Sequence, residues 1–459
     1  MDSKIALIVI GSRALCLVLL LAHTPKANAD WPRFLGSDID STSKQAPTEV
    51  WTEQPSTVWT LEVGDGYGIG SVRGDRYYHF DSVSDSGQLR ERLRCTSMDD
   101  ASIQWSVSDK IDYRDMFGYE DGPRSSPTIV TDQAGRDLIV TMGVSGLLTV
   151  RNLNDGSVVW QIPTSSQYGV VQNFFGVACS PLHLVDETLG DMVVVMVGGS
   201  PPEDQNFPPM ALDRVSDTGT ALVAFALRDG RELWKTGNDL ASYSSPRTAE
   251  LDGRTSIITL ARGSLWIVDA ATGNVLADQD FRAEKLESVN AMVPLVRGDQ
   301  IFVSECYEIG STLFQFKAGK LETLWRDPER DRRRQSMRCH WATPVRVGNY
   351  LYGGSGRNAA DSDFRCVEWS TGRVLWVDER RTRASVTLAG DKLLVLNERG
   401  LLQIVEPTPE RFSVVAEFDL SASGDGLPGL RFPLWSAPVV VGPKVIVRGD
   451  RKVACFQWE

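Results

Sequence analysis

Short apolar runs alternate with polar turn residues along almost the whole chain. Runs rich in Val, Ile, Leu and Tyr, such as DLIVTMG, MVVVMVGG and KLLVLNE, are bounded by Gly, Asp and Asn. Such runs are typical of β-strands, because branched and aromatic side chains pack well on a pleated surface. No long segment keeps a helical period. The pattern therefore predicts an all-β protein.

One opening recurs along the chain: a small or hydroxylated residue, then Pro, then an alternating apolar run, as in GPRSSPTIV, SYSSPRTAE and LWSAPVVVG. The Pro position falls at Pro127, Pro181, Pro246, Pro294, Pro344 and Pro438, and two more units fit with Gly70 and Val386 in its place. The units recur about every 53 residues, and each continues with further strand-like runs. Eight units of four strands predict an eight-bladed β-propeller.

The connection between the third and fourth predicted strands is the sharpest local motif. It reads NLNDGSVVW, ALRDGRELW, DAATGNVLA and EWSTGRVLW, with Gly at 156, 230, 273 and 372. Glycine takes positive φ without steric cost, so we expect a tight hairpin turn at each position. Trp follows in three of the four, and Trp105 and Trp325 hold the same place behind altered turns. These indoles are expected to pack between neighbouring blades.

The two ends of the repeat array complement each other. The last unit ends at KVACFQWE, after its third predicted strand, whereas the Trp-led run PSTVWTLEV at 55–63 precedes the first unit. We expect this run to complete the last blade, which closes the ring and removes its open edges. Residues 30–459 are accordingly predicted to form a single propeller domain.

The first 29 residues have the pattern of a secretory signal peptide. Lys4 precedes an apolar stretch, and ANA at 27–29 is a small-x-small cleavage site. No stop-transfer segment follows, so the mature chain is expected to be exported, periplasmic or extracellular, without a transmembrane span. The net charge of −12 argues against nucleic-acid binding. We expect a monomer.

Six cysteines remain after cleavage, and no two of them form a CxxC: Cys95, Cys179, Cys306, Cys339, Cys366 and Cys455. Three lie in apolar strand-like runs, which favours small buried core residues over a disulfide framework. Their pairing, if any, stays open, because six thiols allow 15 arrangements.

The turn motif resembles the tryptophan-docking motif of the PQQ-like propeller superfamily, which contains quinoprotein alcohol dehydrogenases and BamB-type assembly scaffolds. DWPRFLGSDIDSTS at 30–43 is similar to the head of secreted bacterial PQQ-repeat proteins, and FGYEDGPRSSP and HWATPVRVGNYLYGGSGR are similar to other parts of them. The resemblance covers nearly all of the mature chain and implies the fold rather than a cofactor.

One repeat position has a composition suited to ligand binding. The residues three places before the Pro position are Tyr67, Arg124, Ala178, Tyr243, Ala291, Trp341, Arg383 and Trp435. In a propeller this register lies at one mouth of the central channel. Aromatic rings offer stacking area and Arg offers forked donors, so we expect a ligand site there, with His340 and Arg357 nearby. The alternative is that these residues pack against neighbouring blades.

Two other segments are candidates for contact with partners. Residues 198–220 form the longest insertion in the repeat and are long enough to cover a mouth of the channel. RDPERDRRRQSMR at 326–338 is a basic cluster that reads as a solvated loop or, alternatively, as a docking site for an acidic partner.

The sequence offers little for catalysis. The resemblance implies that a quinoprotein enzyme would carry a vicinal Cys pair, a Ca²⁺ site of Glu, Asn and Asp, and a catalytic Asp, but no two cysteines are adjacent here. HExxH and CxxCH are also missing, which argues against a zinc or haem site. We expect a non-catalytic protein that binds a protein, peptide or glycan without cofactor. A divergent PQQ- and Ca²⁺-dependent oxidoreductase acting on an alcohol or sugar is the alternative.

Overall fold

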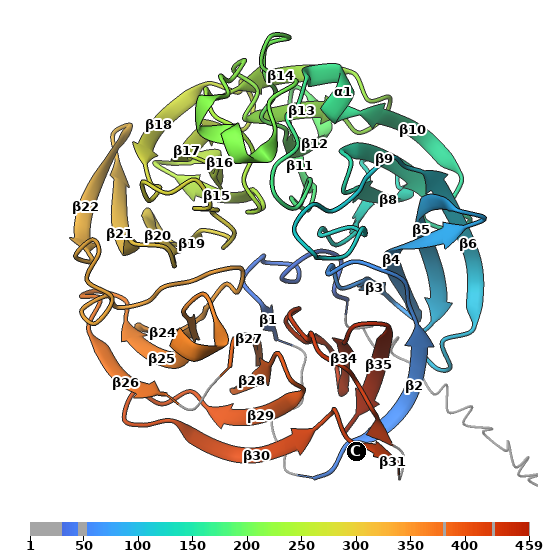
Figure 1. Cartoon of the computed structure of the whole chain (residues 1–459), viewed down its shortest axis with the longest axis vertical. Coiled ribbons are helices and arrows are strands. Elements are labelled where there is room, and N and C mark those ends of the chain that lie inside the picture. The colour runs from blue at the N-terminus through green and yellow to red at the C-terminus, as the bar shows by residue number, and fades with distance from the viewer. Residues whose placement is uncertain (1–29, 45–52, 380–381, 425–426, 459) are drawn as a thin grey trace, which may run out of the picture.

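The computed structural model describes residues 30–44, 53–379, 382–424 and 427–458. Eight sheets, each built on four antiparallel strands, surround one central axis, so the predicted eight-bladed propeller is confirmed (Figure 1). The predicted signal peptide at 1–29 lies outside the described residues. No helix among the described residues is long and apolar enough to cross a membrane.

Seven blades follow one another in chain order. The first four are β3–β6 (Ser71–Arg73, Arg76–Asp85, Gln88–Ser97, Ile103–Lys110), β7–β10 (Thr128–Thr131, Asp137–Met142, Leu147–Asn152, Val158–Pro163), β11–β14 (Leu182–Asp186, Gly190–Met196, Leu222–Ala226, Glu232–Thr236) and β15–β18 (Arg247–Leu251, Arg254–Leu260, Ser264–Asp269, Val275–Asp280). The next three are β19–β22 (Leu295–Arg297, Gln300–Glu305, Gly310–Lys317, Lys320–Arg326), β23–β26 (Val345–Val347, Tyr350–Ser355, Asp363–Glu368, Val374–Asp378) and β27–β30 (Ala384–Ala389, Lys392–Asn397, Leu401–Glu406, Ser413–Asp419).

The eighth blade joins the two ends of the chain. Strands β33 (Val439–Val441), β34 (Lys444–Arg448) and β35 (Lys452–Gln457) are completed by β2 (Ser56–Glu62), which pairs antiparallel with β35. The predicted closure is therefore confirmed. A small hairpin, β31 (Ser423–Gly424) and β32 (Leu427–Pro428), and the short helices α1 (Thr164–Tyr168), η1 (Pro209–Arg214) and η2 (Ala359–Asp361) lie in the connections.

The N-terminal segment has a role that the repeat did not predict. It lies across the centre of the ring (Figure 1), where the Trp31 backbone pairs with Val72 in the first blade and Ile129 N–H donates to Pro32 O in the second. The segment then reaches the seventh blade, where β1 (Thr42–Ser43) adds a parallel fifth strand beside β27. Residues 30–43 thus connect blades from both sides of the ring and obstruct its channel.

The four predicted turn glycines all have positive φ, between 72° and 75°. Each also lies against the indole of the preceding blade, apart from any effect on the turn. A Cβ at Gly230 would lie 2.9 Å from Trp160 Cδ2, and one at Gly273 would lie 2.7 Å from Trp234 Cδ2. The Trp160 indole N–H donates to Leu227 O at 2.8 Å in the next blade. The motif therefore joins neighbouring blades as well as shaping a hairpin.

The recurring opening is explained by hydrogen bonds between blades. Ser126 N–H donates to Ser180 Oγ, and Ser180 N–H donates to Ser245 Oγ, at 3.0 and 2.9 Å. These residues stand directly before Pro in three successive units. One place after the Pro, Thr128 Oγ1 donates to Pro181 O at 2.7 Å. Small hydroxyl residues recur here because they satisfy backbone groups buried between blades.

The core of each blade is apolar, and the six cysteines belong to it. All six are buried and none forms a disulfide. Burial raises the pKa of the Cys179 and Cys339 thiols to about 12, so they stay protonated and unreactive at neutral pH. The expectation of buried core thiols is confirmed.

Candidate binding site at the channel mouth

The register position singled out in the sequence converges on one cavity of about 200 Å³ in the channel. Its lining includes every residue of that position: Tyr67, Arg124, Ala178, Tyr243, Ala291, Trp341, Arg383 and Trp435. Phe34 and Leu35 of the N-terminal segment also line it. Several of these side chains also pack against neighbouring blades, as the alternative expected: Trp435 contacts both Trp341 and Tyr67.

Aromatic rings form a nearly continuous arc around the cavity. Trp341 lies 5.4 Å from Trp435, and Trp435 lies 4.8 Å from Tyr67, between ring centroids. On the far side of Tyr67 the arc continues through residues that the repeat register did not include. Tyr119 packs on Phe175 at 4.8 Å, and Phe175 lies 5.3 Å from Tyr243. The signal for these two was present in the sequence as FGYEDG and NFFG, in long connections where function concentrates.

A buried carboxylate holds one side of the site rigid. Glu398, only 2% exposed, accepts hydrogen bonds from Arg383 Nε at 2.7 Å and from the Trp435 indole N–H at 2.9 Å. The Arg383 guanidinium lies over both Trp341 and Trp435, 4.7 and 5.0 Å from the ring centroids. Trp341 in turn donates its indole N–H to Trp435 O at 3.0 Å. Glu398 was not predictable from the repeat, because its two side-chain partners, Arg383 and Trp435, come from different units.

Arg124 is held in a similar way beside Tyr67. Its guanidinium lies 5.0 Å from the Tyr67 ring centroid and donates to Gly122 O and Glu120 O, both at 2.6 Å. It also pairs with the Asp115 carboxylate at 3.5 Å. Both guanidiniums are therefore engaged within the protein, so the forked donors expected of the ring arginines are already used in part.

The loop that carries Tyr119 also carries a carboxyl with a perturbed pKa. Glu120 accepts a hydrogen bond from Gly66 N–H at 2.5 Å. Burial, with the carboxyl of Asp450 beside it, raises the pKa of Glu120 to about 7. Burial and the nearby Glu120 charge together raise the pKa of Tyr67 to about 12, so its phenol stays protonated.

His340 lines the cavity but is held neutral. Burial and then the charge of Arg383 lower its pKa to about 3, and its Nε2 lies 3.3 Å from Tyr307 Oη. Arg357 does not reach the cavity wall. Its guanidinium lies 4.7 Å from the Tyr307 ring centroid and 3.9 Å from Glu287. Of the ten candidate positions, Arg357 is thus the one placed behind the site rather than in it.

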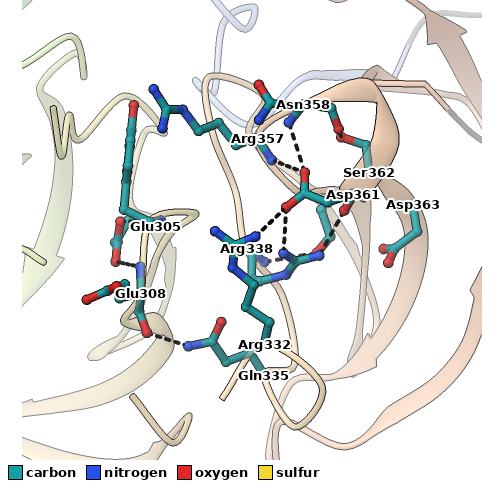
Figure 2. Close-up of polar contacts among 12 residues, drawn as sticks. Glu305, Glu308, Arg332, Gln335, Arg338, Arg357, Asn358, Asp361, Ser362 and Asp363 are labelled. Atoms are coloured by element: carbon teal, nitrogen blue, oxygen red, sulfur yellow. Dashed lines mark hydrogen bonds and ion pairs between the residues drawn. The ribbon is translucent and has the colours of Figure 1, made fainter. Parts of the chain in front are cut away.

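The basic segment at 326–338 is largely neutralised by the protein itself. Figure 2 shows Arg332 and Arg338 directed toward Asp361. The Nη1 atoms of Arg332 and Arg338 lie 3.2 and 3.0 Å from Asp361 Oδ2. Arg330 pairs with Glu284 at 2.8 Å. The structure therefore favours a structural loop over a docking site for an acidic partner.

The insertion at 198–220 lies beside the channel rather than over its cavity. Asp213 of η1 pairs with Arg262 and Arg282 at 2.8 and 2.7 Å, which fastens the insertion to the fourth blade. Leu212 is buried and lines a second cavity together with Gly198. The insertion thus covers the junction of the third and fourth blades.

The residues that line the cavity do not fit PQQ and Ca²⁺, the cofactors of the oxidoreductase alternative. Among the described residues, no group of three or more His, Cys, Asp and Glu side chains is placed to hold a metal ion. A quinone with several carboxylates needs cationic partners, yet Arg124 and Arg383 are engaged with Asp115 and Glu398.

Comparison with known proteins agrees with this geometry. A family model described as outer membrane protein assembly factor BamB matches residues 217–378. The BamB of Shewanella oneidensis is 22% identical over 425 residues, which covers 90% of this chain and 91% of that protein.

Solved structures extend the comparison to the whole ring. The crystal structure of BamB from Moraxella catarrhalis superposes with a TM-score of 0.53 at 13% identity, covering 89% of this chain and 98% of that one. The computationally designed Ika8 protein gives 0.50 at 8% identity, covering 92% and 99%. With the repeat and the blade geometry, these similarities show that the chain has a β-propeller fold similar to that of BamB.

Proposed function

We propose that this chain is an exported, monomeric, non-catalytic binding protein that engages a polypeptide partner at the channel mouth. One observation carries the proposal: eight positions that are far apart in sequence line one cavity, and large aromatic side chains occupy four of them. Aromatic residues of this kind concentrate binding energy at protein interfaces. The aligned relative is named an assembly factor, a role that depends on contacts between proteins.

The chemistry of the site supports binding over catalysis. His340 has its pKa lowered to about 3 and so remains a neutral imidazole at neutral pH. Glu398 is committed to Arg383 and Trp435, which leaves it unavailable as a general base. The thiols are buried, with the pKa of Cys179 raised to about 12.

Site-specific photo-crosslinking in the native cells tests the proposal. A benzophenone amino acid replaces Tyr119, which is 42% exposed at the mouth, and in a control it replaces Val158, which is 47% exposed on the outer strand β10. We expect a discrete protein adduct from position 119, identified by mass spectrometry, that position 158 does not give. Identical adducts from both positions, or none from 119, would overturn the proposal.

The cofactor-free and exported character are tested separately. Purified protein incubated with PQQ and Ca²⁺ should retain no quinone absorbance after gel filtration, and retained absorbance would favour the oxidoreductase alternative. N-terminal sequencing of the exported protein should begin at Asp30, whereas an intact Met1 in that fraction would contradict cleavage.

A further inference from the structure

The channel cavity is selective in size, polarity and charge. Resting on the function proposed above, we propose that it receives one uncharged aromatic side chain of the partner polypeptide, inserted between the Trp341–Trp435 pair and Tyr243. The partner is thereby a chain with an accessible Trp, Tyr or Phe, and not a glycan or a charged peptide.

The size of the cavity matches a single ring. Its volume is about 200 Å³. An apolar protein cavity of about 150 Å³ is large enough to bind benzene, whereas sites for drug-sized ligands span about 300–1,000 Å³. Phe34 and Leu35 line the cavity from the N-terminal segment that obstructs the channel, so a longer ligand has little room to thread through. One indole, phenol or phenyl ring therefore fits, and an oligosaccharide does not.

Most polar groups of the wall already have partners, and among the described lining residues His340 Nδ1 is a buried atom without one. Ser385 Oγ donates to Trp435 O and Ser436 Oγ donates to Tyr67 O, both at 2.6 Å. Tyr243 Oη accepts from Phe175 N–H at 2.8 Å. Sugar hydroxyls that entered here would lose their hydration without gaining equivalent hydrogen bonds, which is costly. An apolar ring loses nothing of this kind.

The charges of the wall are balanced internally, which selects a neutral occupant. The Arg383 guanidinium pairs with Glu398 at 2.7 Å and covers the faces of Trp341 and Trp435. Arg124 likewise lies over Tyr67. A cationic ligand would meet these guanidiniums at the ring faces that a cation prefers. An anionic ligand would have to displace a buried carboxylate from its partner.

The lip of the cavity explains why the ring should come from a polypeptide rather than from a free small molecule. Met116, Phe117 and Tyr119 on one connection are 53%, 38% and 42% exposed, and Phe432 on another is 52% exposed. Phe432 lies 6.1 Å from Trp435, so this apolar surface is continuous with the cavity wall. Residues flanking an inserted aromatic side chain can bury against it, which a lone ring cannot do.

Ligand-observed NMR titration of the full chain tests the proposal with defined probes. The probes are acetylated, amidated peptides Leu-Gly-Xaa-Gly-Leu with Trp, Phe, Lys, Glu or Gly at Xaa, together with N-acetyltryptophanamide and maltotriose. The cavity-filling variant Ala291→Phe is compared with the matched variant Ala134→Phe, in which the same substitution is made at an exposed turn of the second blade. Ala437→Leu, which also fills the cavity, is used if Ala291→Phe does not fold.

We expect the Trp and Phe peptides to bind at least tenfold more tightly than the Lys, Glu and Gly peptides and maltotriose. They should also bind more tightly than N-acetyltryptophanamide. Cavity filling should weaken the Trp peptide at least tenfold, and Ala134→Phe should leave it unchanged. Preference for maltotriose or a charged peptide, equal binding of the free amide, or binding that survives cavity filling would overturn the proposal.

The two proposals fail in different ways. A protein adduct at position 119 without preference for aromatic peptides would leave the binding function standing and overturn the aromatic anchor. Cavity-dependent binding of aromatic peptides without any adduct would overturn the protein-binding function in the cell while leaving the aromatic site intact.

Discussion

The joint between the fourth strand of one blade and the turn of the next permits a sharp test of what holds the ring together. Gly273 has φ +72°, and a Cβ there would lie 2.7 Å from Trp234 Cδ2. Gly253, in the β15–β16 hairpin of the same blade, also has φ +72°, but a Cβ there would meet nothing within 4 Å. The two glycines share backbone strain and differ in the contact between blades.

The expected losses follow from that difference. An alanine in the left-handed backbone conformation is less stable by about 1–2 kcal/mol, so Gly253→Ala should lower the free energy of unfolding by about that amount. Gly273→Ala adds forced repacking of Trp234, worth about 1–3 kcal/mol. It also strains the indole hydrogen bond to Ala270 O, now 3.2 Å long and worth about 1 kcal/mol. The total for Gly273→Ala should therefore be about 3–6 kcal/mol.

Urea unfolding followed by circular dichroism measures both variants, with calorimetric melting as a second readout. In a Trp234→Ala background the extra cost of Gly273→Ala should disappear, leaving only the strain that Gly253→Ala shows. Equal losses for the two glycine variants in the wild-type background would refute the role assigned to the indole contact. Persistence of the extra cost without Trp234 would refute it as well.

Two further predictions concern a buried carboxyl and the closing strand. Burial raises the pKa of Glu91 from 4.5 to about 7. Between these pH values the folded protein holds a proton that the unfolded chain releases, so the free energy of unfolding falls as pH rises. The total fall is on the order of 3 kcal/mol. Glu91→Gln, which keeps an acceptor for Val144 N–H, should flatten unfolding free energy measured between pH 5 and 8, and an unchanged slope would contradict this. Trp59 of β2 is 5% exposed and donates to Met98 O at 2.9 Å, so Trp59→Ala should cost about 3–5 kcal/mol in urea unfolding. Ile103→Ala on an outer strand, 56% exposed, should stay within about 0.5 kcal/mol, and equal losses would argue against closure by β2.

The blades, their turns and their closure were predictable because each is repeated or complementary in the sequence. Gly156 and Gly372 stand at fixed distances from a Trp position, and both adopt the positive φ expected of them. The same register placed Tyr67 and Trp435, at opposite ends of the chain, on one cavity. Because the units repeat, the place of a residue in one blade predicts the place of the equivalent residue in the other blades.

Features that occur once were not predictable in this way. Leu35, Ile39 and Ser41 take φ near +60° without being glycine, which gives the N-terminal segment a path that no propensity indicates. Tyr119 and Phe175 come from connections of unequal length that have no counterpart in other units. The pairing of Arg383 with Glu398 depends on how two strands of a blade lie together. This ion pair holds the Arg383 guanidinium, which we had expected to donate to a ligand, in the cavity wall.

Different positions of the repeat join the blades into a ring and line its cavity. Next to the Pro position, Ser180, Ser245 and Thr343 each accept a backbone N–H from the preceding blade, so a small hydroxyl residue is favoured there. Two places earlier, backbone pairing makes no such demand, and the residue varies from Ala178 to Trp341. On the function proposed above, substitution at this register should change the ligand, because its residues line the shared cavity. The hydrogen bonds next to the Pro position, which join neighbouring blades, would stay in place.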